Sequence, residues 1–243
     1  MHGMRIAVLS DIHGNLAALH AVAADLHTRG VDTVVNLGDS VSGPLLPLET
    51  AQYLMAQDWV HLAGNHERQL LHLSPTASFS DQYAHAQLSP RELEWMARLP
   101  HTHFLTDQIL LCHGAPGVDH MALLQTAERP ATAREIEARL GGHHAELILC
   151  GHTHVARSVR TARGVLIVNP GSVGLQAFAD DHPYPHVVES GSPDARYAIV
   201  ERGPAGWTSQ LLTVPYAHQP MAELAGQRNR PDWAHALMTG YAP

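Results

Sequence analysis

Short apolar runs that end abruptly in polar residues alternate with helical patterns over the first part of the chain. Residues 4–9 form an apolar run with β-branched side chains, which favours a buried parallel strand. Residues 16–28 place apolar side chains three and four positions apart, which favours a helix that ends at Gly30. The same unit continues as a strand, a helix and a strand at residues 33–37, 48–57 and 59–62. This alternation predicts parallel strands covered by helices.

Beyond residue 100 the pattern changes to short strands that follow one another closely. Residues 103–114 predict two such strands, and residues 156–168 predict a hairpin that turns at Gly164. Further strands are expected at residues 147–150, 195–202 and 208–216, with helices at residues 132–140 and 231–238. Together these elements predict an α/β fold of two mixed β-sheets lying face to face with helices outside, as one domain over residues 1–243.

Two stretches do not follow these patterns. Residues 68–100 are polar and contain Pro75 and Pro90, and only residues 91–99 predict a helix there. Residues 175–195 are rich in proline, aspartate, histidine and serine, which predicts a loop. We expect both stretches to be insertions that cover a site.

The composition excludes several classes of protein. Hydrophobic residues make up 45% of the 243 residues, and no apolar run approaches the roughly 20 residues that a membrane helix needs. The formal net charge is −8, and no stripe of Lys and Arg is long enough to follow a phosphate backbone, so duplex nucleic acid is not an expected partner. The first residues lack a signal-peptide pattern, so a cytoplasmic protein is expected. Cys112 and Cys150 lie in apolar runs, which favours buried thiols, while a bridge between them stays open.

Polar side chains follow five of the predicted strands, at the point where each strand ends. The five segments are Asp11-Ile12-His13, Gly38-Asp39, Gly64-Asn65-His66-Glu67, His113-Gly114 and Gly151-His152-Thr153-His154. Each has an ordinary structural explanation by itself, such as a helix N-cap for Asp11 or a turn for Asn65. Ligands of α/β proteins, however, bind outside the carboxyl ends of the strands. Five ends that carry Asp, Asn and His therefore predict one shared metal site.

The five motifs and their order resemble those of the calcineurin-like binuclear metallophosphoesterases, in particular the small bacterial phosphodiesterase branch. The motifs are D-x-H, G-D, G-N-H-E, H-G and G-H-T-H. The segments SDIHGNLAAL at residues 10–19 and VNPGSVG at residues 168–174 are also similar to that branch. The resemblance extends over roughly residues 4–215. It implies a metallophosphoesterase-like αββα sandwich that binds two divalent metal ions.

The resemblance implies a role for each matching residue. It makes Asp39 the ligand that bridges both ions. The other metal ligands would be Asp11, His13 and His154 for the first ion and Asn65, His113 and His152 for the second. Carboxylate, carboxamide and imidazole suit borderline divalent ions, so Mn²⁺ is expected first, with Fe, Zn²⁺, Co²⁺ or Ni²⁺ as alternatives.

His66 would be the catalytic side chain, because in the family this histidine protonates the leaving alkoxide or stabilises the transition state. Asp39 is expected to orient it. No substrate-binding residue is identified. Arg68 could contact a substrate phosphate, and Asn15 could either do the same or cap the following helix.

The expected activity is hydrolysis of phosphodiester or small nucleotide-like phosphoester bonds by a hydroxide that bridges the two ions. The alternatives are a protein Ser/Thr phosphatase or other phosphomonoester phosphatase, a diadenosine-polyphosphate hydrolase, a nuclease, and a non-catalytic metal-binding scaffold of the same fold. The missing basic groove counts against a nuclease, and the missing second histidine of H-E-x-x-H excludes a zinc protease. The expected partner is a small phosphoester substrate. A homodimer is the commonest symmetric assembly, but the sequence leaves the oligomeric state open.

Overall fold

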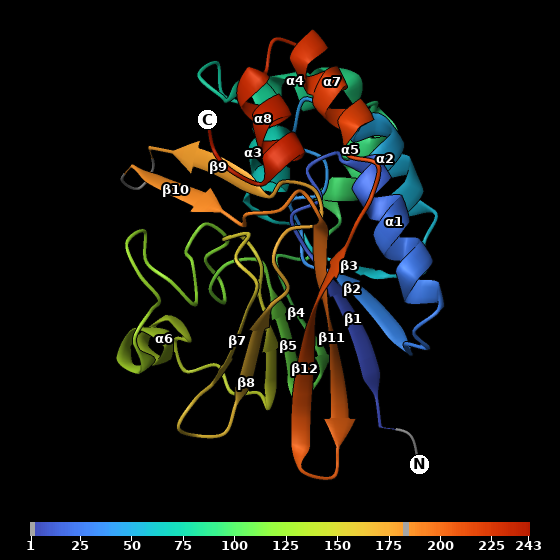
Figure 1. Cartoon of the computed structure of the whole chain (residues 1–243). Coiled ribbons are helices and arrows are strands. Elements are labelled where there is room, and N and C mark those ends of the chain that lie inside the picture. Colours follow the sequence, from blue (N-terminus) through green and yellow to red (C-terminus); the bar gives the residue numbers. More distant parts are fainter. Residues whose placement is uncertain (1–2, 182–184) are drawn as a thin grey trace.

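Two β-sheets lie face to face at the centre of the computed structural model, which describes residues 3–181 and 185–243 (Figure 1). The first sheet has the strand order β12-β11-β1-β2-β3, with β1, β2 and β3 parallel and β11 antiparallel to β1. Its strands are β1 (Arg5–Leu9), β2 (Thr33–Asn36), β3 (Val60–His61), β11 (Ala195–Gly203) and β12 (Gly206–Val214).

The second sheet has the order β4-β5-β6-β8-β7, in which β5, β6 and β8 are parallel and the two edge strands are antiparallel. Its strands are β4 (Thr102–Thr106), β5 (Ile109–Cys112), β6 (Leu147–Leu149), β7 (Arg157–Arg160) and β8 (Leu166–Asn169). The parallel centre of each sheet directs several strand ends toward the same side of the molecule.

The inner faces of the two sheets share the main core. Val8 of β1 packs in one buried cluster with Leu111 of β5 and Leu149 of β6. Burying a side chain of this size stabilises a fold by roughly 1.5–3 kcal/mol. Helix α1 (Leu16–His27) covers the outer face of the first sheet through residues such as Leu19, and α6 (Ala133–Arg139) covers the second through Ile136 (Figure 1). The predicted fold class is confirmed: two mixed sheets lie between layers of helices.

The remaining helices gather at one end of the sandwich (Figure 1). They are α2 (Pro47–Met55), α3 (Asn65–Leu71), α4 (Phe79–Gln87), α5 (Pro90–Ala97), α7 (Gln219–Gln227) and α8 (Pro231–Thr239). A separate hairpin of β9 (Ala177–Asp180) and β10 (His186–Glu189) lies beside α8. No helix in the described part of the chain is both long and apolar enough to cross a bilayer.

Two expectations from the sequence are wrong at the level of secondary structure. The segment 64–67 is not a loop, because Asn65 begins α3 and Glu67 closes a capping box at its start. The predicted loop at 175–195 contains β9 and β10, except for residues 182–184, which lie outside the described residues. Strands of four residues carry too little periodicity to be distinguished from polar loops. Ala177 is buried in a cluster that includes residues of the C-terminal helices, a contact that no local pattern indicates.

The polar stretch 68–100 consists largely of helices rather than irregular chain. Ser78 begins α4 by accepting a hydrogen bond from the Asp81 backbone N–H, and Ser89 begins α5 in the same way through Arg91. Ala84 of α4 and Met96 of α5 are buried in a shared cluster at this end of the sandwich. The helices are short and mostly polar, so their apolar faces are too narrow to be recognised along the sequence.

Candidate metal centre

The loops that follow β1, β2, β5 and β6 are joined to one another by backbone hydrogen bonds. Asp11 N–H donates to the Gly38 carbonyl at 3.0 Å, and His13 N–H donates to the Asp39 carbonyl at 3.0 Å. In the second sheet, Gly151 N–H donates to the His113 carbonyl at 2.7 Å. These bonds fix the strand ends against each other and bring the predicted ligands to one place.

The predicted ligands form two clusters. In the first cluster, the ligand atoms of Asp11, His13 and His154 lie within 4.8 Å of one another, and all three side chains are buried. In the second cluster, Asp39, His113 and His152 satisfy the same limit. Asp11 faces both clusters, because its Oδ1 lies 3.4 Å from His154 Nε2 and 3.8 Å from His113 Nε2.

Backbone carbonyls orient three of the imidazole rings. The Nδ1 atoms of His13, His113 and His154 lie 2.8, 2.9 and 2.8 Å from the carbonyl oxygens of Ser42, Leu37 and Leu175. A carbonyl oxygen can only accept, so each Nδ1 carries the proton and donates it. Each ring therefore turns Nε2 toward the centre, which is the orientation of metal-bound histidine.

The donor set fits metal ions better than it fits a network of hydrogen bonds. Nε2 of His13 lies 3.1 Å from Nε2 of His154, and two lone pairs at this separation repel unless a cation lies between them. Asp11 Oδ1 and Asn65 Oδ1 are buried and have no hydrogen-bond partner within the described residues, and His113 Nε2 lies 3.0 Å from Asp39 Oδ2. Buried polar atoms without partners are costly, and a divalent ion accepts such oxygen and imidazole ligands.

Backbone strain is concentrated at the same residues. Of the six non-glycine residues with positive φ in the described ranges, five are predicted ligands. They are Asp11, His13, Asp39, His152 and His154, with φ between 51° and 71°. A left-handed conformation costs a non-glycine residue about 1–2 kcal/mol. Such strain persists where the surrounding structure enforces it and is typical of functional sites.

The charges in the centre shift the pKa values of its side chains. Burial would raise the pKa of Asp39, but the neighbouring His113 and His66 hold it well below its usual value. Burial and the neighbouring His154 lower the pKa of His13 to about 4. Burial and the neighbouring His113 lower the pKa of His152 to about 4. His113 differs, because burial would lower its pKa but the charge of Asp39 outweighs burial and raises the pKa to about 10. The centre thus holds ionised carboxylates and two imidazoles that stay neutral, and a metal ion at His113 would have to displace a proton.

Glu67 holds two of the ligand loops together. Its buried carboxylate accepts backbone N–H groups of Asp39 at 2.8 Å, Ser40 at 2.7 Å and Gly64 at 2.7 Å. The loops approach so closely that a Cβ on Gly64 would lie 2.3 Å from Asp39 Oδ1, so only glycine fits there. One side chain thus fixes Asp39 relative to the first turn of α3.

His66 is held by a carboxylate from α4. Its Nδ1 lies 2.8 Å from Asp81 Oδ1, and the side chain of Asp81 also accepts the hydroxyls of Ser42 and Ser78, both at 2.7 Å. Burial would lower the pKa of His66, but the charges of Asp39 and Asp81 outweigh it and raise the pKa to about 9. The ring stays partly exposed, with 26% of its side-chain surface accessible, whereas that of Asp81 is 5% accessible.

Residues 4–189 match the family model described as the calcineurin-like phosphoesterase superfamily domain. The chain belongs to this superfamily. Members of the calcineurin-like phosphoesterase superfamily are hydrolases that bind divalent metals, and the two clusters described above are candidate ligand sets for such ions.

Several relatives cover nearly the whole chain. An uncharacterized protein of Methanocaldococcus jannaschii is 26% identical, over 94% of both chains. A metallophosphoesterase from Sphaerobacter thermophilus is 25% identical in sequence, and its crystal structure matches this one with a TM-score of 0.74 over 97% of this chain and 98% of that one. A hypothetical protein from Pyrococcus horikoshii shares the fold at 18% identity, with a TM-score of 0.71 over 99% of this chain and 100% of that one. These neighbours place the calcineurin-like phosphoesterase fold over the C-terminal region as well.

The structure also shows the contacts of the two residues whose roles the sequence left open. Asn15 is buried, accepts the Ala18 N–H at 3.1 Å and donates to the Gly174 carbonyl at 2.9 Å, so it caps α1. Arg68 makes a bidentate ion pair with Asp119, at 2.7 and 3.0 Å. The expected orientation of His66 by the Asp39 carboxylate is wrong for the ring: Asp39 accepts the His66 backbone N–H at 2.9 Å, while Asp81 holds the imidazole.

Replacing Glu67 by glutamine is expected to destabilise this calcineurin-like phosphoesterase even without metal. The amide retains one accepting oxygen and turns an NH₂ group toward backbone N–H donors, which leaves buried donors unpaired. We expect the free energy of unfolding to fall by about 2–3 kcal/mol in urea titrations with a chelator present. Glu94→Gln is the matched control, because Glu94 is exposed on α5. Equal stability of the two variants would contradict the role of Glu67.

Proposed function

We propose that the chain is a binuclear metal-dependent phosphodiesterase that acts on phosphodiesters or small nucleotide-like phosphoesters. The observation that carries this proposal is the arrangement of two ligand clusters around Asp11 and Asp39, with the partly exposed ring of His66 beside them. A scaffold needs no proton donor there. The buried Asp81 carboxylate that holds the ring favours a catalytic role for His66.

The ligand roles follow from the clusters. Asp11, His13 and His154 would hold one ion, and Asn65, His113 and His152 would hold the other. Asp39 is assigned as the bridging ligand, because its charge acts on His13 of the first cluster as well as on His113 of the second. Two divalent ions held by these residues would polarise phosphoryl oxygens and lower the pKa of a bound water molecule. Mn²⁺ is our first choice for both positions.

His66 is assigned as the general acid. The Nδ1–H group donates to Asp81, so Nε2 is the atom available to a leaving-group oxygen. The carboxylate of Asp81 stabilises the protonated ring and fixes its rotation, which keeps the proton at Nε2 until the ester bond breaks. After proton transfer the neutral ring retains its Nδ1–H bond to Asp81, so its orientation does not change during the reaction.

Metal-dependent turnover of an aryl phosphodiester tests the proposal. Protein stripped with a chelator is expected to be inactive on bis(p-nitrophenyl) phosphate and to recover activity as Mn²⁺ is added. The matching monoester, p-nitrophenyl phosphate, and a phosphopeptide should be poorer substrates by kcat/KM. Higher activity on the monoester or the phosphopeptide would favour the phosphatase alternative. Absence of turnover on all three with metal bound would contradict the proposed activity and favour the scaffold function.

A further inference from the structure

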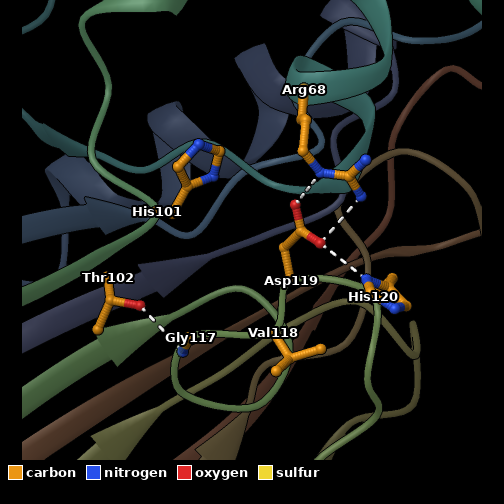
Figure 2. Close-up of a pocket in the computed structure, with 7 residues that line it drawn as sticks. All are labelled: Arg68, His101, Thr102, Gly117, Val118, Asp119 and His120. Atoms are coloured by element: carbon orange, nitrogen blue, oxygen red, sulfur yellow. Dashed lines mark hydrogen bonds and ion pairs between the residues drawn. The ribbon is translucent and has the colours of Figure 1, made fainter.

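A cavity of about 490 Å³ opens between the start of α3, the start of β4 and the loop that follows β5. It is lined by Arg68, His101, Thr102, Gly117, Val118, Asp119 and His120 (Figure 2). Figure 2 shows Arg68 extending from the helix toward Asp119 on the facing loop, with His101 and His120 on either side of this pair. The volume is in the range of pockets that bind small molecules.

Two segments that line this cavity also carry predicted ligands of the second ion. Arg68 lies three residues after Asn65 on α3, and residues at this spacing share one face of a helix. Asp119 packs against the residue after His113, because a Cβ on Gly114 would lie 2.5 Å from the Asp119 carbonyl oxygen. The Arg68–Asp119 pair therefore joins the two segments that supply Asn65 and His113 to the centre.

The acidic group of the cavity is occupied, whereas one edge of the Arg68 guanidinium is free to donate. The Asp119 carboxylate is already occupied by Arg68 Nε and Nη2 and by His120 Nδ1 at 3.0 Å. Thr102 Oγ1 accepts the Gly117 N–H at 3.4 Å. Arg68 Nη1 has no partner among the described residues. The rings of His101 and His120 are exposed beside it.

The same lining argues against a nucleobase. Stacking on an aromatic side chain is the usual means of holding a base. No Phe, Tyr or Trp is among the residues that line the described cavity. A cationic guanidinium with a free edge beside two imidazoles instead suits a phosphate group, which arginine binds through paired N–H donors.

We propose that this cavity binds a second phosphate of the substrate, with Arg68 as the binding residue. The inference rests on the proposed function, because it assumes that the scissile phosphate lies at the ligand clusters. The preferred substrates would then carry at least two phosphate groups, one at the centre and one between Arg68 and the neighbouring imidazoles. The ion pair with Asp119 keeps Arg68 in place before the second phosphate arrives.

Binding of matched mono- and bisphosphates tests this proposal without relying on turnover. The probes are propyl phosphate and the bisphosphates of ethane-, propane-, butane- and pentanediol, which span a range of distances between the two phosphates. Titration calorimetry with the Mn²⁺-loaded protein should show that at least one bisphosphate binds roughly tenfold to a hundredfold more tightly than propyl phosphate. In Arg68→Gln the bisphosphate and propyl phosphate should bind with roughly equal affinity.

Asp119→Asn is the matched variant, because it breaks the same ion pair while leaving the positive charge of Arg68 in the cavity. It should keep or increase the preference for the bisphosphate. The proposal is overturned if no bisphosphate binds the wild type more tightly than propyl phosphate. It is also overturned if Arg68→Gln and Asp119→Asn reduce the preference equally, since the pair would then have only a structural role. Failure of the wild type to hydrolyse any phosphoester, with the binding preference intact, would instead contradict the proposed function alone.

Discussion

Asp39→Asn is expected to abolish most of the activity, with kcat/KM on bis(p-nitrophenyl) phosphate falling by roughly a thousandfold. The substitution removes the negative charge that is assigned to both ions. It leaves the fold in place for two reasons: asparagine tolerates the positive φ of 54° at this position, and its Oδ1 can still accept the His66 N–H. The metal content after dialysis should fall together with the activity.

Asp58→Asn is the control for this variant, because Asp58 is exposed and removal of its charge changes the net charge by the same amount. It should keep the activity and metal content of the wild type. Retention of full activity in Asp39→Asn would exclude Asp39 as a bridging ligand. Loss of activity with both ions still bound would limit its role to orientation of the site.

His66→Asn is expected to lower kcat by about 10²–10⁴-fold while both metal ions stay bound. The amide of asparagine can donate to Asp81 as Nδ1 does now, but it offers no acidic proton at the position of Nε2. The loss should be greater for alkyl esters than for p-nitrophenyl esters, because a poor leaving group depends more on protonation. His144→Asn, at an exposed position, is the control.

Asp81→Asn should show a smaller loss with the same dependence on the leaving group, because it weakens the orientation of His66 and leaves the proton donor in place. A uniform loss across leaving groups in either variant would assign His66 to binding rather than to proton transfer. Loss of metal from His66→Asn would place this histidine among the ligands.

The strand ends made the grouping of the candidate ligands predictable from the sequence. A buried run such as Leu147–Leu149 that stops at a glycine and two histidines indicates where a parallel strand ends, and such ends gather on one side of a sheet. Combined with family motifs, this located the residues of both clusters. The division of His152 and His154 between clusters also agrees with the grouping of their ligand atoms.

The residues that support the centre were not predictable in the same way. Asp81 lies on a polar helix, and its sequence signal, a serine three residues before it, indicates only where that helix starts. Its contact with His66 depends on how α4 packs on α3, which no local pattern encodes. Glu67 had a recognisable capping-box position, but its additional bonds to Asp39 and Ser40 depend on the approach of two loops that are distant in sequence.

The positions with positive φ show why local propensity fails at this site. His13, His152 and His154 adopt backbone conformations that their own preferences disfavour, because the hydrogen bonds between the loops enforce them. Propensity therefore describes the strands and helices of this chain better than it describes the turns that carry the ligands.

Anomalous diffraction from crystals of the Mn²⁺-loaded protein tests the central claim most directly. We expect two anomalous peaks about 3.5–4 Å apart, one beside Asp11, His13 and His154 and one beside Asn65, His113 and His152. The Asp39 carboxylate should lie between them. A single peak, or two peaks without a shared carboxylate, would contradict the binuclear centre on which the proposed phosphodiesterase activity depends.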